Sequence, residues 1–174
     1  MPKLSHALML VAGLSLAACA NPDRFGAGSD GFGPGGAGMG IDQAGLGDVN
    51  DPRSPAFFQS QIGDRVFFTV DSSSLNDNAR QTLQAQARWL IDNPQFRIII
   101  EGHADERGTR EYNVALGARR ANAVVEFLAA QGIATSRMRT VSYGKERPVE
   151  ACPEPRCWDV NRRAVTVISV GAGA

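Results

Sequence analysis

Asp105 and Arg120 are the residues of this chain whose types and setting point most clearly to binding chemistry. Asp105 lies in a charged loop over 103–111, and Arg120 lies further along, among apolar residues. An arginine in such a setting needs a partner, because an unpaired guanidinium in an apolar environment is costly. That partner is either Asp105, in a structural ion pair, or the carboxylate of a ligand. The spacing alone leaves both interpretations open.

A buried strand and an amphipathic helix position these two residues. The β-branched run at 96–101 predicts the strand, and the pattern at 111–131 predicts the helix, which Gly132 ends. Arg120 falls four residues from apolar positions on either side, so it lies on or beside the buried stripe. These apolar positions recur at spacings of three and four, and they include Leu116, Ala121, Val124, Phe127 and Leu128. A strand, a charged loop and a helix in this order are a common setting for a site.

The remainder of the chain from residue 57 predicts one domain of α/β class, an α+β sandwich. Further strands are predicted at 65–70, 138–143 and 163–170, and a further helix at 76–92. The resulting order is βαβαββ, with one sheet and two main helices. Strand–helix–strand repeats favour parallel neighbouring strands joined by right-handed crossovers.

The first 18 residues have the features of a secretory signal peptide, with Lys3 followed by an apolar run at 7–16. This run is too short to span a membrane. It ends in Leu-Ala-Ala-Cys, which places Cys19 where a bacterial lipobox has its lipidated cysteine. The alternative is an ordinary signal peptide with a chance cysteine. Residues 20–21 lack the aspartate that retains lipoproteins in the inner membrane, so we expect an anchor in the outer membrane.

Residues 19–56 predict a flexible linker. Ten of the nineteen glycines lie between Gly26 and Gly47, with almost no aliphatic residues, which leaves too little apolar surface to fold. A Gly-rich coil of this length spans roughly 35 Å on average and stretches to about 120 Å. Such a segment tethers a domain to a membrane. The alternative is a partner-binding tail, for which Phe25 and Phe32 are the aromatic contacts.

Composition argues against several classes of function. Without Lys3 the chain has 17 basic residues (18 − 1) and 18 acidic residues, so no basic field argues for nucleic acid. His103 is the single histidine after the signal peptide, whereas a hydrolytic zinc site usually needs three protein ligands. We therefore expect no metal and no cofactor. We expect His103 to be a structural hydrogen-bonding residue at the end of its strand.

Three stretches in the right order resemble the family of OmpA-like peptidoglycan-binding domains. They are EGHADERGTREYNVALGARRANAV from residue 101, VSYGK from residue 141 and NRRAV from residue 161. The resemblance covers roughly 57–170. It implies a non-catalytic lipoprotein that anchors the outer membrane to peptidoglycan by binding the meso-diaminopimelate stem peptide. It also implies a TolB-like periplasmic β-propeller protein as a partner, and a role in outer-membrane constriction at cell division.

The resemblance also implies a ligand site. Asp105 matches the aspartate that meets the ammonium of the ligand, and Arg120 matches the arginine that clamps its carboxylate with a geometry that lysine cannot reproduce. Asn113 and Leu116 belong to the same helix pattern. They are expected to offer amide hydrogen bonds and an apolar wall.

The loop after the first strand matches the segment that lines the other wall of the site. Val70 and Asp71 are its expected contacts. Thr69 departs from the family pattern, in which an aspartate is frequent, so Asp71 is the better candidate for a carboxylate role. A structural role for Asp71, as a helix or turn cap, stays open.

Two pairs of residues in the second half have competing interpretations. Cys152 and Cys157 lie in a Pro-rich loop of an exported protein, which predicts a disulfide that stabilises by about 2 kcal/mol. The alternative, a metal site, lacks further ligands. Arg162 and Arg163 open the last predicted strand, where they either cover a sheet edge with charge or contact the wall or a partner.

Two other functions compete with the anchor. A wall-modifying hydrolase could share the binding surface, although the chain lacks a second histidine in this region and a pair of carboxylates on facing elements. A protein-partner hub without wall contact is the third possibility. Loss of Asp105 and Arg120 without effect on wall binding would support the hub.

Overall fold

The structure is a computed structural model that describes residues 46–170. The predicted signal peptide, Cys19 and most of the predicted linker therefore lie outside the described residues. Helices and strands follow one another as α1 (Pro55–Phe57), a π-helical segment (Phe58–Gly63), β1 (Arg65–Phe67), α2 (Asp77–Asp92), β2 (Phe96–His103), α3 (Arg110–Ala130), a 3-10 turn (Thr135–Arg137), β3 (Met138–Gly144), α4 (Pro155–Asn161) and β4 (Arg163–Val170).

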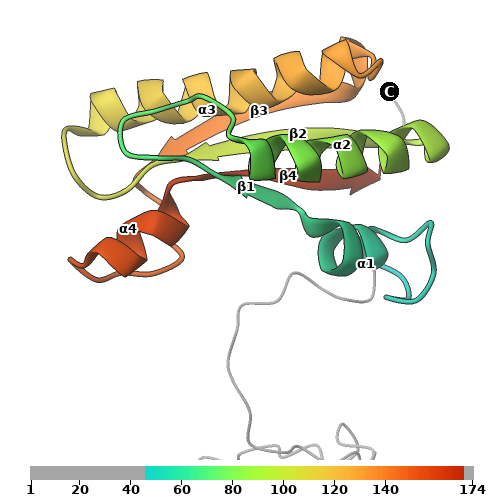
Figure 1. The fold of residues 1–174 in the computed structure, drawn as a ribbon, viewed down its shortest axis with the longest axis horizontal. Helices are drawn as coiled ribbons and strands as arrows, with labels where there is room; N and C mark the ends of the chain where they lie inside the picture. The colour runs from blue at the N-terminus through green and yellow to red at the C-terminus, as the bar shows by residue number, and fades with distance from the viewer. Residues whose placement is uncertain (1–45, 171–174) are drawn as a thin grey trace, which may run out of the picture. The chain divides into compact units, whose positions relative to one another are not determined.

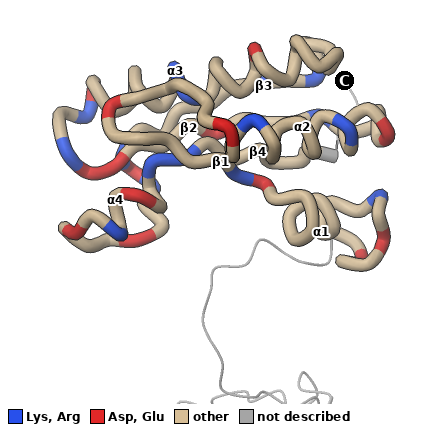
Figure 2. The backbone as a smooth tube through the Cα atoms, viewed as in Figure 1, with Lys and Arg blue, Asp and Glu red and all other residues tan. Residues whose placement is uncertain are grey.

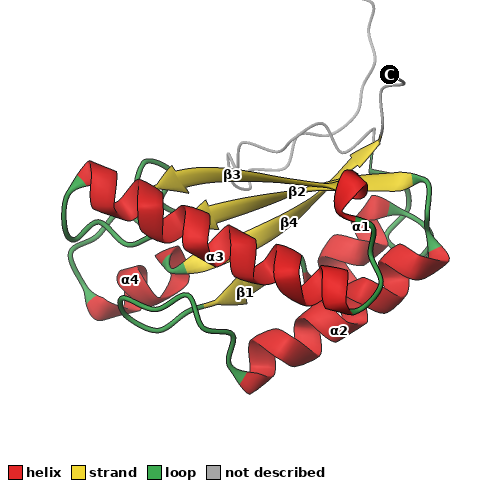
Figure 3. Cartoon of the chain, turned by 90° about the horizontal axis from the view of Figure 1, so that it is seen from above, coloured by secondary structure: helices red, strands yellow, loops and turns green. Residues whose placement is uncertain are grey.

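The four strands form one mixed sheet in the order β1-β4-β2-β3, and α2 and α3 cover one of its faces (Figures 1 and 3). The predicted fold class is confirmed. The β2–α3–β3 unit gives parallel neighbours as expected, with Ile98 opposite Met138. The β1–α2–β2 unit does not, because β4 lies between β1 and β2 and pairs antiparallel with both.

The central place of β4 corrects one expectation about Arg162 and Arg163. Neither covers a sheet edge, because the strand that Arg163 opens is flanked by β1 and β2. Both arginines are buried. Their side chains therefore need internal partners, and Arg162 finds one of them in the candidate site described below.

Local sequence signals set the ends of the two long helices. Asn76 caps α2 by accepting a hydrogen bond from the Ala79 amide at 2.8 Å, and Thr109 caps α3 in the same way. At the other end of α3, Gly132 adopts a φ of +97°. The Ile133 amide then donates to the Leu128 carbonyl at 3.1 Å, which closes the helix as predicted.

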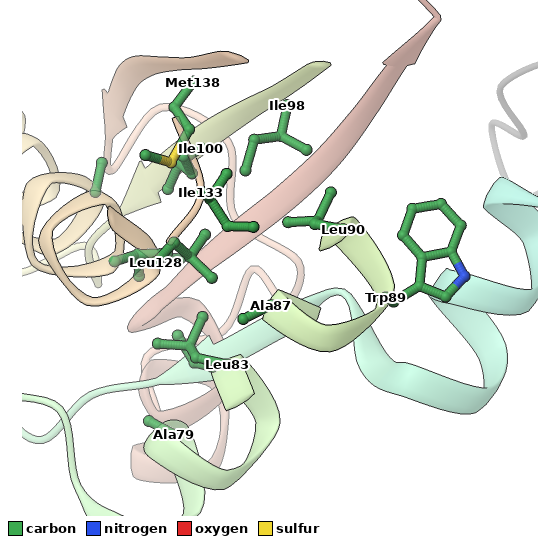
Figure 4. Close-up of a cluster of buried hydrophobic side chains, with 14 of the residues drawn as sticks. Ala79, Leu83, Ala87, Trp89, Leu90, Ile98, Ile100, Leu128, Ile133 and Met138 are labelled. Carbon is green, nitrogen blue, oxygen red and sulfur yellow. The ribbon is translucent and has the colours of Figure 1, made fainter. Parts of the chain in front are cut away.

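The apolar core lies between the sheet and the two long helices (Figure 4). Leu83 and Leu90 of α2, Ile98 and Ile100 of β2, and Leu128 of α3 are all almost fully buried. The alternation along β2 directs its even-numbered side chains toward the helices. This core fixes the positions of β2 and α3. Asp105 follows the end of β2, and Arg120 lies within α3.

A close contact between two glycines brings α3 directly onto β2. A Cβ atom added to Gly102 would lie 1.8 Å from the carbonyl oxygen of Gly117, so the two backbones touch where side chains would otherwise separate them. Ser142 of β3 also donates to the Val114 carbonyl of α3 at 2.6 Å. These contacts hold the middle of α3 against the end of β2, close to Arg120.

Three parts of the fold differ from the sequence-based expectations. The first strand ends at Phe67 rather than at residue 70, and Asp71 beyond it has a φ of 54°. Residues 46–56, inside the predicted linker range, contact the domain, since Trp89 Nε1 donates to the Pro52 carbonyl at 2.7 Å. Helix α4 occupies the predicted Pro-rich loop. In the described part of the chain, no helix has the length and hydrophobicity needed to cross a membrane.

Candidate functional site

Arg120 lies fully buried beneath the loop that follows β1. Its Nε donates to the Ser72 carbonyl at 2.8 Å, and its two terminal nitrogens donate to the carbonyls of His103 at 2.7 Å and Thr69 at 3.2 Å. The guanidinium carbon also lies 5.2 Å from the centre of the Phe68 ring. Arg120 therefore joins the loop after β1 to the end of β2.

Backbone carbonyls, and not the Asp105 carboxylate, are the direct partners of Arg120. The guanidinium has five N–H donors, of which the three carbonyl bonds use three. Burial lowers the pKa of Arg120 to about 10, while the charges of Asp105 and Asp71 oppose that shift. Arg120 is therefore cationic at neutral pH, with two N–H donors beyond its carbonyl bonds.

Asp105 is buried at the end of β2 and is paired with two other arginines. Arg107 approaches with both Nε, at 3.2 Å from Oδ1, and a terminal nitrogen, at 2.7 Å from Oδ2. Arg162 donates to Oδ2 at 3.1 Å. Burial alone would raise the pKa of Asp105, but the hydrogen bonds from Arg107 and Arg162 outweigh it and lower that pKa below its ordinary value. The carboxylate is therefore ionised.

Asn113 and Leu116 lie on the same buried side of α3 as Arg120. The Asn113 amide nitrogen donates to the Arg107 carbonyl at 2.7 Å, so the helix holds the loop that contains Asp105. Leu116 is also buried. The structure thus brings the predicted helix residues together with the loop, and it gives Asn113 a partner within the protein.

Val70 and Asp71 lie exposed at the tip of the loop after β1. The Tyr112 hydroxyl donates to Asp71 Oδ1, and this hydrogen bond raises the pKa of Tyr112. Asp71 does not cap α2, because Asn76 does so. The loop tip therefore lies beside the first turn of α3. Arg120 binds the backbone carbonyls of Thr69 and Ser72, which lie on either side of this tip.

His103 is buried, and its ring does not make the hydrogen bonds that the sequence led us to expect. Neither ring nitrogen has a hydrogen-bond partner among the described residues, although Nε2 lies 3.5 Å from Glu101 Oε2. Burial, together with the positive charges of Arg163 and Arg147, lowers the pKa of His103 to about 3. The ring is therefore neutral, and it is the backbone carbonyl of His103 that bonds Arg120. Within residues 46–170, no three potential ligand side chains gather as a metal site would require.

The sequence did not single out Arg107 and Trp158, which complete this end of the molecule. The Arg107 guanidinium carbon lies 4.2 Å from the centre of the Trp158 ring, and Trp158 Nε1 donates to Glu106 at 3.1 Å. Both acidic and basic positions lie along α4 and the loops next to it (Figure 2). The charged run Asp-Glu-Arg at 105–107 was visible in the sequence, but its partner on α4 was not.

Helix α4 is held in place by a disulfide and by one buried amide. Cys152 and Cys157 are bonded, with Cα atoms 5.8 Å apart. Asn161 accepts from the Val149 amide at 2.7 Å and donates to the Glu150 carbonyl at 2.7 Å. Between β1 and α4 lies a pocket of about 330 Å³, partly lined by Arg162.

Comparisons with known proteins give a consistent relationship. The family model described as "OmpA family" matches residues 67–162. A peptidoglycan-associated lipoprotein of Agrobacterium fabrum is 59% identical over 122 residues, which cover 70% of this chain and 68% of that protein. A protein of the same name from Pseudomonas aeruginosa is 48% identical over 97 residues, covering 56% of this chain and 57% of that one.

Solved structures share the same fold. The crystal structure of the peptidoglycan-associated lipoprotein from Burkholderia pseudomallei has a TM-score of 0.62 and 42% identity, and the match covers 70% of this chain and 98% of that one. The C-terminal domain of Helicobacter pylori MotB has a TM-score of 0.58 at 21% identity, over 63% of this chain and 86% of that one, and so shares the fold alone. The chain therefore belongs to the OmpA family and groups there with the peptidoglycan-associated lipoproteins.

Proposed function

We propose that this protein is a non-catalytic anchor that binds peptidoglycan at the end of β2 described above. One observation carries the proposal. Arg120 ties the loop after β1 and the end of β2 to α3, so a buried cation and the buried Asp105 carboxylate lie at the same end of the sheet. To bind a ligand that carries both an ammonium and a carboxylate, a site needs an anion and a cation at a fixed separation.

The diaminopimelate residue of the stem peptide is such a ligand. Asp105 is the proposed partner of its ammonium. Arg120 is the proposed partner of its carboxylate. Because the guanidinium is fully buried beneath the loop after β1, this loop has to move before a ligand reaches the N–H donors that the carbonyl bonds leave over. The exposed loop tip at Val70 and Asp71 supplies one wall of the site. Asn113 and Leu116 support the site from α3, Asn113 through the Arg107 carbonyl.

The rest of the proposal concerns where the domain works. Cys19 is the proposed lipid attachment site, which anchors the chain in the outer membrane, and the residues that follow it tether the wall-binding domain to that anchor. More than one lipid chain is needed for stable anchoring. A TolB-like β-propeller protein is the proposed periplasmic partner, with a role in outer-membrane constriction at division. Family membership is the support for these points, and a Cys19→Ala variant that stays in the outer-membrane fraction would refute the anchor.

Sedimentation with purified cell wall tests the ligand. The lipid-free chain from residue 20 is mixed with diaminopimelate-type peptidoglycan, either native or with its free amino groups acetylated. We expect wild type to pellet with the native wall and to stay in solution with the acetylated one, because acetylation removes the ammonium that is proposed to bind Asp105. Asp105→Asn, checked for folding by circular dichroism, should also stay in solution. Equal pelleting with both walls would show that the ammonium is not recognised, and no pelleting would refute wall binding.

A further inference from the structure

The Asp105 carboxylate already accepts as many hydrogen bonds as it can hold. Oδ1 accepts from the Arg107 amide and from Arg107 Nε, both at 3.2 Å. Oδ2 accepts from a terminal nitrogen of Arg107 at 2.7 Å and from Arg162 at 3.1 Å. A carboxylate offers about four lone-pair sites, so all of them are taken. A ligand ammonium can reach Asp105 only if one of these donors leaves.

The two arginines differ in how easily they can leave. The Arg162 side chain is 7% exposed, and it also bonds Asp159 and the Phe68 carbonyl at 3.2 Å. The Arg107 side chain is 42% exposed and reaches Asp105 from the surface. Buried arginines with several partners are costly to move, whereas an exposed arginine gains little from any one ion pair. Arg107 is therefore the donor that a ligand can replace.

Trp158 gives Arg107 a second contact that does not depend on Asp105. The guanidinium carbon lies 4.2 Å from the ring centre, within the range of a cation–π interaction. Trp158 is fixed in turn by its hydrogen bond to Glu106 and by its place on α4, which the Cys152–Cys157 disulfide closes. An Arg107 side chain released from Asp105 can thus stay on the indole without moving far.

We propose that Arg107 is a specificity-determining residue that occupies the ammonium position of the wall site in the free protein. This inference rests on the proposed function of the same site. A ligand binds by exchanging its own cation for the Arg107 guanidinium at Asp105, and ligands without a cation are rejected because Arg107 keeps its place. The competition lowers the apparent affinity by the fraction of protein in which the position is filled.

The test compares Arg107→Gln with Arg110→Gln. Both remove one arginine near Asp105 in the chain, but Arg110 is the first residue of α3, its side chain is 72% exposed, and it pairs with Glu146 rather than with Asp105. Affinity is measured for wild type and both variants by sedimentation over a range of peptidoglycan concentrations. We expect Arg107→Gln to bind native wall about three- to tenfold more tightly than wild type. Arg110→Gln should stay within about twofold of wild type.

Acetylated wall and a titration complete the test. Arg107→Gln should bind more acetylated wall than wild type does, because the Arg107 guanidinium no longer fills the ammonium position at Asp105 and so no longer excludes ligands without a cation. Weaker binding of native wall by Arg107→Gln would overturn the proposal and make Arg107 a direct ligand contact. Unchanged binding would also overturn it. A separate measurement needs no wall, since carbon NMR of the Asp105 carboxyl should show a higher pKa in Arg107→Gln. An unchanged pKa would mean that the ion pair is absent in solution, whatever the wall result.

Discussion

Strand β2 has an arginine bound to backbone carbonyls at each of its two ends, and the surroundings of these two arginines differ. At the start of β2, Arg137 donates to the Phe96 carbonyl at 2.9 Å and to the carbonyls of Leu90 and Asn93. At the other end, Arg120 bonds three carbonyls in the same manner. The number of carbonyl bonds is the same, so this pattern by itself is a structural device and does not mark a site.

The charges nearby are what separate the two ends. Burial is the sole cause that lowers the pKa of Arg137, whereas the pKa of Arg120 also responds to Asp105, Arg162 and Asp71. Arg120 therefore works within a cluster of ionised groups next to an exposed loop. A buried arginine thus becomes a candidate binding residue when other charges and accessible backbone surround it.

The largest expected effect comes from removing these arginines one at a time. Arg120→Ala should weaken wall binding at least 30-fold, ~2–5 kcal/mol, because it removes the proposed carboxylate clamp. Arg137→Ala should stay within about twofold of wild type in wall binding, because it lies at the far end of the strand. Each variant should lose about 1–3 kcal/mol of unfolding free energy, since carbonyls lose their donors.

Sedimentation and urea unfolding, run on both variants, separate binding from stability. A similar loss of stability in the two variants makes them matched controls. If Arg137→Ala loses wall binding as fully as Arg120→Ala, the two ends are equivalent and the comparison fails.

Gly117, within α3, and Gly132, just beyond its C-terminal end, offer a second contrast, in stability. A Cβ at Gly117 would lie 2.4 Å from Ser142 Oγ and 2.8 Å from the Gly102 carbonyl oxygen, so Gly117→Ala should cost about 1–3 kcal/mol. Gly132 faces open space and has positive φ, so Gly132→Ala should cost about 1 kcal/mol. Urea unfolding measures both. Equal costs would mean that helix–strand contact is not tighter at the site.

We expect the pH dependence of the unfolding free energy to come from residues at the end of β2 that holds the candidate site. The folded-state pKa of His103, about 3, lies below the ordinary value of 6.5, so the unfolded chain binds the extra proton between these values. Stability should therefore fall as pH drops from 6.5 to 4.5, by about 2 kcal/mol through this residue. Asp105, whose pKa is lowered in the folded state, loses its contribution to stability at lower pH, where its carboxylate becomes protonated.

Unfolding of wild type and His103→Gln at pH 7.0, 5.5 and 4.5 checks this. The chain from residue 20 has one histidine, so the variant should lose most of the slope in this range. An identical slope in both proteins would place the acid sensitivity elsewhere.

The smallest expected effect concerns Asp71 at the loop tip. Asp71→Asn tolerates the same positive φ, so unfolding free energy should change by less than about 0.5 kcal/mol. Wall binding should weaken by about threefold, because the carboxylate is exposed and screened by solvent. Titration of the variant with native wall measures this change. A loss as large as that of Arg120→Ala would shift the centre of the site to the loop.

Local sequence patterns predicted most of the helices and strands. The features that the sequence did not predict depend on contacts between residues far apart in the chain. Apolar spacing and helix caps act within a few residues, which is why α2 and α3 begin and end within one residue of the predicted bounds. The insertion of β4 between β1 and β2 depends on pairing across the whole domain. Helix α4 has seven residues, too few for a periodic signal, and depends on the disulfide and Asn161.

The same division applies to the candidate site. The position of Arg120 on the buried stripe was predictable from its spacing, and its burial is confirmed. Its partners were not predictable, because carbonyls of Thr69, Ser72 and His103 carry no side-chain signal in a sequence. The pairing of Asp105 with Arg162 joins residues far apart in the chain, and only the folded sheet brings them together.

Side-chain NMR of the two arginines tests the central claim most directly. The Nε–H signals of Arg120 and Arg137 are followed while a soluble diaminopimelate-containing stem peptide is added to the labelled chain from residue 20. Ligand binding at the end of β2 predicts that the Arg120 signal and the backbone amides of 69–72 and 105–107 shift together, while the Arg137 signal stays in place. Shifts centred on Arg137, or an Arg120 signal that does not move at saturating peptide, would contradict the assignment of the site.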